Sequence, residues 1–182
     1  MSNRFLVIAN GNIARRDKDN TFSGTNTFDG KVELPMGEVS YFNTTGTGVT
    51  ISAQSDGSTN MVKCSVTSVL SDPCSCFDNG GANNGRLRYV EAVTKDFHIA
   101  CTISIAPEEA NDTFVFGVAK NGTVIDSCKV LVKVLNAGDT RSTALHAFTS
   151  LATNDYLELY VGNTTDAGDV TIKTLTLFAM GM

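Results

Sequence analysis

The chain has 182 residues, of which 14 are Lys or Arg and 19 are Asp or Glu, so it carries a net charge of -5. This acidic balance argues against a nucleic acid partner, whose phosphates are bound by clustered basic side chains. No stretch approaches the ~20 apolar residues of a membrane helix, and the first apolar run, FLVIA, is shorter than a signal-peptide core. We therefore expect no membrane association, and synthesis in the cytoplasm of the producing cell.

The first 35 residues differ in character from the rest. The stretch NTFSGTNTFDG contains NTFxG twice with an offset of six residues. Because six is an even number, Phe22 and Phe28 would share one face of an extended strand. An apolar run and a basic group precede this repeat. We predict that residues 1–35 form an extended arm that docks on another surface through Phe5, Leu6, Ile8, Arg15, Arg16, Phe22 and Phe28.

The remaining chain, residues 36–182, is a series of short strand-like runs separated by turn residues. The sequence is rich in Thr, Val, Asn and Ser, and it contains 16 Gly, 3 Pro and no Trp, a composition that favours strands and turns. Such spacing without a helical period predicts an all-β sandwich or barrel. The ten expected strands span residues 38–43, 48–54, 61–70, 86–93, 96–106, 113–120, 128–135, 142–151, 155–161 and 169–180.

Alternation within these runs predicts which side chains are buried. In DYLELYV, Leu157, Leu159 and Val161 share one face, which we assign to the core. The residues between them lie on the other face, so the tyrosines should point outward. After TFVFGVAK, the dipeptide Asn121-Gly122 is a strong hairpin signal. The stretch DNGGANNG, residues 78–85, reads as a mobile exposed loop.

Catalysis finds little support in the sequence. His98 and His146 could pair with Cys101 or a carboxylate as a base or a ligand, but both histidines lie in strand-like runs and no nucleophile or metal-protease motif accompanies them. We interpret them as strand residues held by packing. We expect no enzyme activity, no catalytic residues and no cofactor.

Metal and disulfide sites are also weakly indicated. Five cysteines make an odd, irregularly spaced set that fits reduced thiols better than a disulfide framework. Cys74-Ser75-Cys76 leaves two alternatives open, half of a zinc site or a disulfide across a subunit contact. The acidic turns APEEAND and NTTDAGD could offer oxygen ligands to calcium, but neither follows a calcium-loop spacing. We expect solvated acidic turns and no bound metal.

The C-terminal half resembles a known family. The segments KDFHIACTISIAP, FVFGVAKNGTVI, DYLELYVGNTT and VTIKTLTLFAMGM, within residues 85–182, are similar to the jelly roll of the tumour-necrosis-factor (TNF) and C1q-like superfamily as it occurs in bacteriophage structural proteins. The NTFxG repeat is similar to segments of phage tail fibres and other virion appendages. The resemblance implies a TNF/C1q-like jelly-roll β-sandwich preceded by an arm, assembled as a homotrimer in which Phe22 and Phe28 meet their counterparts from the other copies.

Together these features favour a phage capsid decoration, or cement, protein on the outer capsid surface of the virion, with the major capsid protein as partner. Such a protein stabilises the assembled shell by binding it. The alternative is a short fibre or receptor-binding protein that recognises a host glycan or protein. A cupin-like enzyme would need a histidine cluster that this chain lacks. In the receptor-binding alternative, the outward recognition residues would be Asn79, Asn83, Asn84, Tyr156 and Tyr160.

Overall fold

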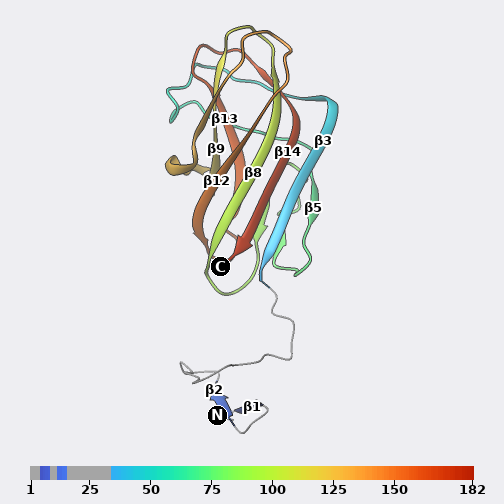
Figure 1. Ribbon diagram of the computed structural model, residues 1–182, viewed down its shortest axis with the longest axis vertical. Helices are drawn as coiled ribbons and strands as arrows, with labels where there is room; N and C mark the ends of the chain where they lie inside the picture. Colours follow the sequence, from blue (N-terminus) through green and yellow to red (C-terminus); the bar gives the residue numbers. More distant parts are fainter. Residues whose placement is uncertain (1–4, 9–11, 16–33) are drawn as a thin grey trace. The chain divides into compact units, whose positions relative to one another are not determined.

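The computed structural model describes residues 5–8, 12–15 and 34–182, and the chain separates into two units, Met1–Val32 and Glu33–Met182 (Figure 1). In the first unit, β1 (Phe5–Ile8) pairs antiparallel with β2 (Asn12–Arg15). This short hairpin was not expected from the sequence. Arg16, Phe22 and Phe28 lie outside the described residues. The prediction that Phe22 and Phe28 share one face of an extended strand therefore concerns residues that the structure does not describe. The roles assigned to residues 1–35 and 36–182 stay predictions.

The second unit consists of two antiparallel sheets. Its only helical turn within residues 34–182 is η1 (Asp126–Cys128), a single 3-10 turn. No helix among the described residues is long and apolar enough to cross a membrane. The strands are β3 (Met36–Val49), β4 (Val62–Lys63), β5 (Val69–Ser71), β6 (Phe77–Asp78), β7 (Leu87–Tyr89), β8 (Lys95–Pro107), β9 (Thr113–Lys120), β10 (Thr123–Val124), β11 (Val130–Lys133), β12 (Arg141–Leu151), β13 (Tyr156–Asn163) and β14 (Val170–Gly181).

One sheet, here the β8–β14 sheet, has the strand order β12-β8-β14-β3-β5. Its long strands β8 and β14 lie side by side, flanked by β12 and β3 (Figure 1). The register of β14 shifts between Ile172 and Thr174 against both of its neighbours. The other sheet is here named the β9–β13 sheet, because β9 pairs with β13 at its centre. On its other edge β9 pairs with β10 and β11, and on its other edge β13 pairs with β4 and β7.

The core lies between the sheets and follows the period-two alternation of the strands. In β8, Phe97, Ile99, Cys101, Ile103 and Ile105 are all buried, while the residues between them face away from the core. In β13, Leu157, Leu159 and Val161 are buried as predicted. Burying each such side chain contributes roughly 1.5–3 kcal/mol, so one continuous apolar layer holds the two sheets together.

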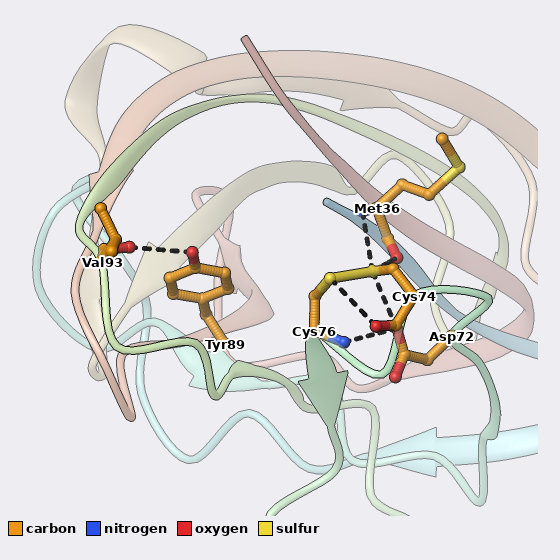
Figure 2. The surroundings of a disulfide bond; sticks show 6 residues. All are labelled: Met36, Asp72, Cys74, Cys76, Tyr89 and Val93. Carbon is orange, nitrogen blue, oxygen red and sulfur yellow. Dashed lines mark hydrogen bonds between the residues drawn. A yellow bond between two sulfur atoms is a disulfide. The ribbon is translucent and has the colours of Figure 1, made fainter. Parts of the chain in front are cut away.

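An aromatic cluster closes the end of the core near the C-terminus of β14. The ring of Phe97 lies 5.4 Å from that of Phe77 and 5.0 Å from that of Tyr89, both in tilted or edge-on geometry. The Tyr89 hydroxyl donates to the Val93 carbonyl at 2.9 Å (Figure 2). This bond satisfies the polar end of a ring that is otherwise buried.

Several strand predictions are confirmed and three are wrong. The expected hairpin forms between β9 and β10, with Asn121 and Gly122 both at positive φ, 51° and 80°. By contrast, residues 48–54, 61–70 and 86–93 are mostly not strand. The long strand β3 ends at Val49, only the short strands β4 and β5 form in the second run, and only β7 forms in the third. The alternation in the second run is real, since Cys64, Val66 and Ser68 are buried, but it reflects an extended segment without a paired ladder.

The expectation that all cysteines are reduced is wrong at two positions. Cys74 and Cys76 form a disulfide within the chain (Figure 2). A turn at Ser75, whose φ is 56°, brings their Cα atoms to 5.2 Å, within the usual range for a disulfide. Cys64, Cys101 and Cys128 are free and buried.

Candidate self-association face

The side of the β8–β14 sheet that faces away from the core is here named the open face. It consists of the even-numbered residues of 36–42, 98–104, 142–148 and 174–180, together with Val69. Strand register places these residues in rows across β12, β8, β14 and β3, because residues directly opposite in neighbouring strands share a face. Sequence reasoning did not identify this face, although alternation of small, aromatic and hydroxyl residues in its strands was visible.

One end of the open face is apolar. Phe148 of β12 lies opposite His98, His98 lies opposite Met180, and Met180 lies opposite Met36. In the next row, Phe178 lies opposite Ala100 and is partly buried. Phe148 is 64% exposed. Side chains from four strands therefore form one mostly apolar surface, in which Phe148 is exposed and the others are half-buried.

The two histidines meet on this surface. His98 Nε2 and His146 Nδ1 are 3.0 Å apart, and their rings are parallel within 5°. One nitrogen donates and the other accepts, and the tautomers of the two rings decide which does which. Phe148 lies 5.0 Å from His98. The pairing was missed because 48 residues separate the histidines in the sequence, although both belong to strands that were predicted.

Cys101 takes no part in this pair. Its side chain points to the opposite side of β8, into the core, and burial together with nearby Cys128 raises the pKa of its thiol to about 12. A thiol in that state is a poor nucleophile. The pairing of the histidines with Cys101 that was considered from the sequence is therefore not formed.

The other end of the open face carries hydroxyl groups beside exposed apolar side chains. Ser104 Oγ and Ser142 Oγ are hydrogen-bonded at 2.8 Å. Phe42 is 77% exposed and Val69 is 69% exposed. Glu38 is the only Asp, Glu, Lys or Arg among the residues that define the face. An exposed surface this apolar and poor in charge is typical of an interaction site.

The outer side of the β9–β13 sheet is different, and it is here named the covered face. Its residues are Val115, Gly117, Ala119, Tyr156, Glu158, Tyr160 and Gly162. Residues 51–63 follow its edge, where Ser55 N donates to the Asn163 carbonyl at 2.7 Å. A Cβ atom at Gly162 would lie 2.6 Å from Ser55 Cβ and 3.2 Å from Met61 Cγ, so the glycine permits this close approach. The chain therefore covers this face itself.

Glu158 shows the consequence of this cover. Alternation places it on the outward side with the tyrosines, yet it is only 2% exposed. Its Oε1 accepts from Lys63 Nζ at 2.6 Å and from Arg86 Nε at 2.8 Å. Glu158 therefore lies on the face that alternation assigns to it, but it is enclosed because basic side chains from two other segments fold over it.

The tyrosines proposed for recognition lie on the side of β13 away from the core, but both are half-buried. The Arg86 guanidinium lies 4.1 Å from the centre of the Tyr156 ring. Burial, followed by nearby Glu158, raises the pKa of Tyr160 above its ordinary value. Neighbouring side chains thus limit the access of a partner to both rings.

The proposed recognition loop at 78–85 is less open than expected. Asp78 is held by Arg88 through bonds of 2.7 and 2.6 Å, and Gly85 is buried. Asn83 is exposed, whereas Asn79 and Asn84 are half-covered. Asn79 donates to Asn83 within the loop. A recognition role for these asparagines stays a prediction.

Among the residues that the structure describes, one group meets a simple distance criterion for metal binding. Asp72 and the sulfurs of Cys74 and Cys76 have ligand atoms within 4.8 Å of one another. Because the two sulfurs are bonded to each other, they would serve as thiolate ligands only after reduction. Asp72 Oδ1 instead accepts from the Cys76 backbone N–H at 3.1 Å (Figure 2).

Comparison with known proteins identifies the fold. No protein-family model matches the sequence, and no curated protein sequence matches it. Murine APRIL at pH 5.0 is similar over 81% of this chain and 99% of its own, with 8% identity and a TM-score of 0.51. Eiger TNF from S. frugiperda is similar over 81% of this chain and 93% of its own, with 14% identity and a TM-score of 0.50.

A third structure, the PRD1 vertex protein P5, covers 81% of this chain and 96% of its own at 8% identity, with a TM-score of 0.49. A score below 0.5 supports no argument. Identities this low show the fold alone. The chain therefore has an all-β, TNF-like jelly-roll fold, as predicted, and its function has to be argued from its surfaces.

Proposed function

We propose that this chain is a structural protein of a bacteriophage particle, a homotrimer that decorates the outer capsid surface and stabilises the head. The observation that carries the proposal is the open face, which leaves Phe42, Phe148 and Val69 exposed and has Glu38 as the one charged residue among those that define it. Exposed apolar patches of this kind occur at interaction sites or cause aggregation. A copy of the same chain is the occupant we propose.

The chemistry of the open face fits self-association. Phe148 and Phe42 lie on strands at opposite sides of β8 and β14, so each could pack against a different neighbouring copy. Each buried aromatic side chain contributes roughly 1.5–3 kcal/mol, and a closed ring of three copies repeats that contribution at every contact. The number three comes from the family resemblance noted in the sequence.

Attachment to the capsid is assigned to residues 1–35. The NTFxG repeat resembles segments of virion appendages, and the first unit is separate from the jelly roll. The major capsid protein is the proposed partner. Anything that binds the assembled shell but not its dissociated parts stabilises the shell by mass action, so attached trimers would strengthen the head without catalysis.

A binding assay on undecorated heads tests this function. The full chain should sediment with the heads and raise their resistance to heat. Deletion of residues 1–19 should abolish binding while the jelly roll stays folded, whereas shortening of the 78–85 loop should leave binding intact. If the deletion variant still binds and protects heads while the loop variant fails to bind host cells, the receptor-binding alternative replaces the decoration proposal.

A further inference from the structure

Two acidic turns that are far apart in the sequence meet at one end of the sandwich. The first, residues 107–113, joins β8 to β9, and the second, residues 163–170, joins β13 to β14. Thr164 N donates to the Thr113 carbonyl at 2.8 Å, and Thr113 N donates to Thr165 Oγ1 at 3.0 Å. These two hydrogen bonds fix the position of one turn relative to the other.

Asp112 occupies an unusual environment between these turns. The residue is fully buried, and within residues 34–182 neither carboxylate oxygen has a partner that meets hydrogen-bond geometry. Its backbone carbonyl is satisfied, since Val134 N donates to it at 2.8 Å. Buried polar side chains nearly always have partners, because an unpaired buried charge is strongly disfavoured. A fixed backbone thus holds a buried carboxylate near which, within residues 34–182, the Asn163 amide is the only side-chain donor.

A second carboxylate, that of Asp166, lies near Asp112 and makes the ionised form of Asp112 less favourable. A Cβ atom at Gly168 would lie 2.8 Å from Asp112 Oδ2, 3.0 Å from Asp166 Oδ1 and 3.2 Å from Asn163 Nδ2, so both carboxylates face the space left by this glycine. The Asn163 amide donates to Asp166 at 2.9 Å and to the Gly168 carbonyl at 3.1 Å. Burial first, then the charges of Asp166 and Glu109, raise the pKa of Asp112.

We propose that Asp112 and Asp166 bind a calcium ion between these turns. A cation would supply the partner that both Asp112 oxygens lack and would neutralise the repulsion between the two carboxylates. The available donors are hard oxygen atoms on irregular turns, which suit calcium and its flexible geometry better than magnesium, whose octahedral demands are stricter. Neither turn contains His or Cys, so zinc is disfavoured.

Calcium at these turns differs from the sequence expectation, which was solvated acidic turns and no bound metal. The site needs neither self-association nor attachment to a capsid. The sequence showed the two turns but not that the fold joins them. It also could not show that Asp112 is buried, because acidic turn residues are ordinarily exposed. The site is built by the pairing of β9 with β13, which brings Thr113 beside Thr164.

Calcium titration of the full chain, freed of metal with EDTA, tests the proposal by calorimetry and thermal unfolding. We expect one calcium ion per chain, with a dissociation constant below about 1 mM. At a hundredfold excess over that constant, Tm should rise by about 5–10 °C. Magnesium should bind at least tenfold more weakly. The absence of both heat and a Tm shift at 10-fold higher calcium, on the order of 10 mM, would overturn the proposal.

Two variants and a control localise the effect. Asp112→Asn keeps the shape of the side chain and removes its charge, and it should weaken calcium binding at least tenfold; Asp166→Asn should also weaken it. Asp126→Asn changes the net charge equally at an exposed position on η1 and should bind calcium like the unchanged chain. Calcium binding that is unaffected by Asp112→Asn and Asp166→Asn would contradict the site, even if one variant folds poorly.

Discussion

The two sheets of the jelly roll differ in how their outer faces are covered. Across the covered face, the chain lays Met61 and Ser55 against Gly162, and Lys63 and Arg86 enclose Glu158. Within residues 34–182, no segment covers the open face in this way, and Phe42 and Phe148 are exposed there. A sheet face that is covered by other segments of the same chain can therefore hold a buried charge, because those segments supply its partners. A face that is apolar and exposed can instead be covered by another copy.

The largest expected effect comes from breaking the charge cluster of the covered face. Glu158→Ala would leave Lys63 and Arg86 facing each other without their carboxylate, and we expect a loss of about 3 kcal/mol in the free energy of unfolding. Urea denaturation measures this loss. Glu38→Ala on the open face is the matched control and should change the monomer by less than about 0.5 kcal/mol. Equal effects of the two substitutions would remove the distinction between the faces.

A second substitution tests whether residues 51–63 cover the sheet. Gly162→Ala would place a methyl group 2.6 Å from Ser55 Cβ, and we expect a cost of about 1–3 kcal/mol from the forced displacement. Gly48→Ala in β3 is the control, because a Cβ there has nothing within 4 Å. Thermal unfolding of both variants provides the comparison, and an unchanged Tm for Gly162→Ala would argue against close cover.

The hairpin beside the covered face gives a pH-dependent prediction. Burial disfavours the charge of Asp155, but bonds from Lys120 at 2.8 Å and Asn121 at 2.6 Å outweigh it, so its pKa lies below the ordinary value. A lowered folded pKa contributes stability above the ordinary pKa, and this contribution is lost as the pH falls through the folded pKa. Asp155→Asn should therefore cost about 1 kcal/mol at pH 7.

The measurement is the free energy of unfolding against pH for both proteins. The two curves should converge as the pH falls through the lowered folded pKa of Asp155, because the aspartate is then protonated in the folded state too. Asp112 has the opposite sign, because its raised pKa makes the ionised form destabilising when no cation is bound. Asp112→Asn in EDTA should consequently stabilise the protein at neutral pH. A constant difference between the Asp155→Asn and unchanged curves at all pH values would contradict the assignment.

The smallest expected effect on folding is on the open face. Phe42→Ser and Phe148→Ser replace exposed side chains, so each should change the stability of the isolated monomer by less than about 0.5 kcal/mol. Denaturation at high dilution, where copies are separate, checks this. A loss of several kcal/mol would mean that these rings belong to the core of the subunit.

Much of the fold could be predicted from local pattern. The residue alternation in 113–120 and 155–161 and the Asn121-Gly122 turn specify β9, β13 and the hairpin, because strand period and turn conformation are local properties. The segment 61–70 shows the limit of this reasoning. It alternates as a strand does, yet most of it pairs with nothing, since alternation reports only which side of an extended chain is buried.

The sites depended on contacts that the sequence does not show. The register of β8 with β12 brings His98 to His146, and the joined turns bury Asp112, but both arise from residues far apart in the chain. Likewise, nothing in DYLELYV distinguishes a covered Glu158 from an exposed one. Long-range pairing decides which polar residues are enclosed, so the sequence predicted the strands better than their surroundings.

Sedimentation of the full chain and its open-face variant tests the central claim most directly. At micromolar concentration the unchanged chain should have three times the 19.3 kDa mass of one copy, with or without reductant, because apolar contacts hold it together. The double variant Phe42→Ser/Phe148→Ser should dissociate to monomers. Leu131→Ser, at another exposed apolar position in β11, should leave the trimer intact. A monomeric unchanged chain, or dissociation by Leu131→Ser alone, would contradict self-association through the open face.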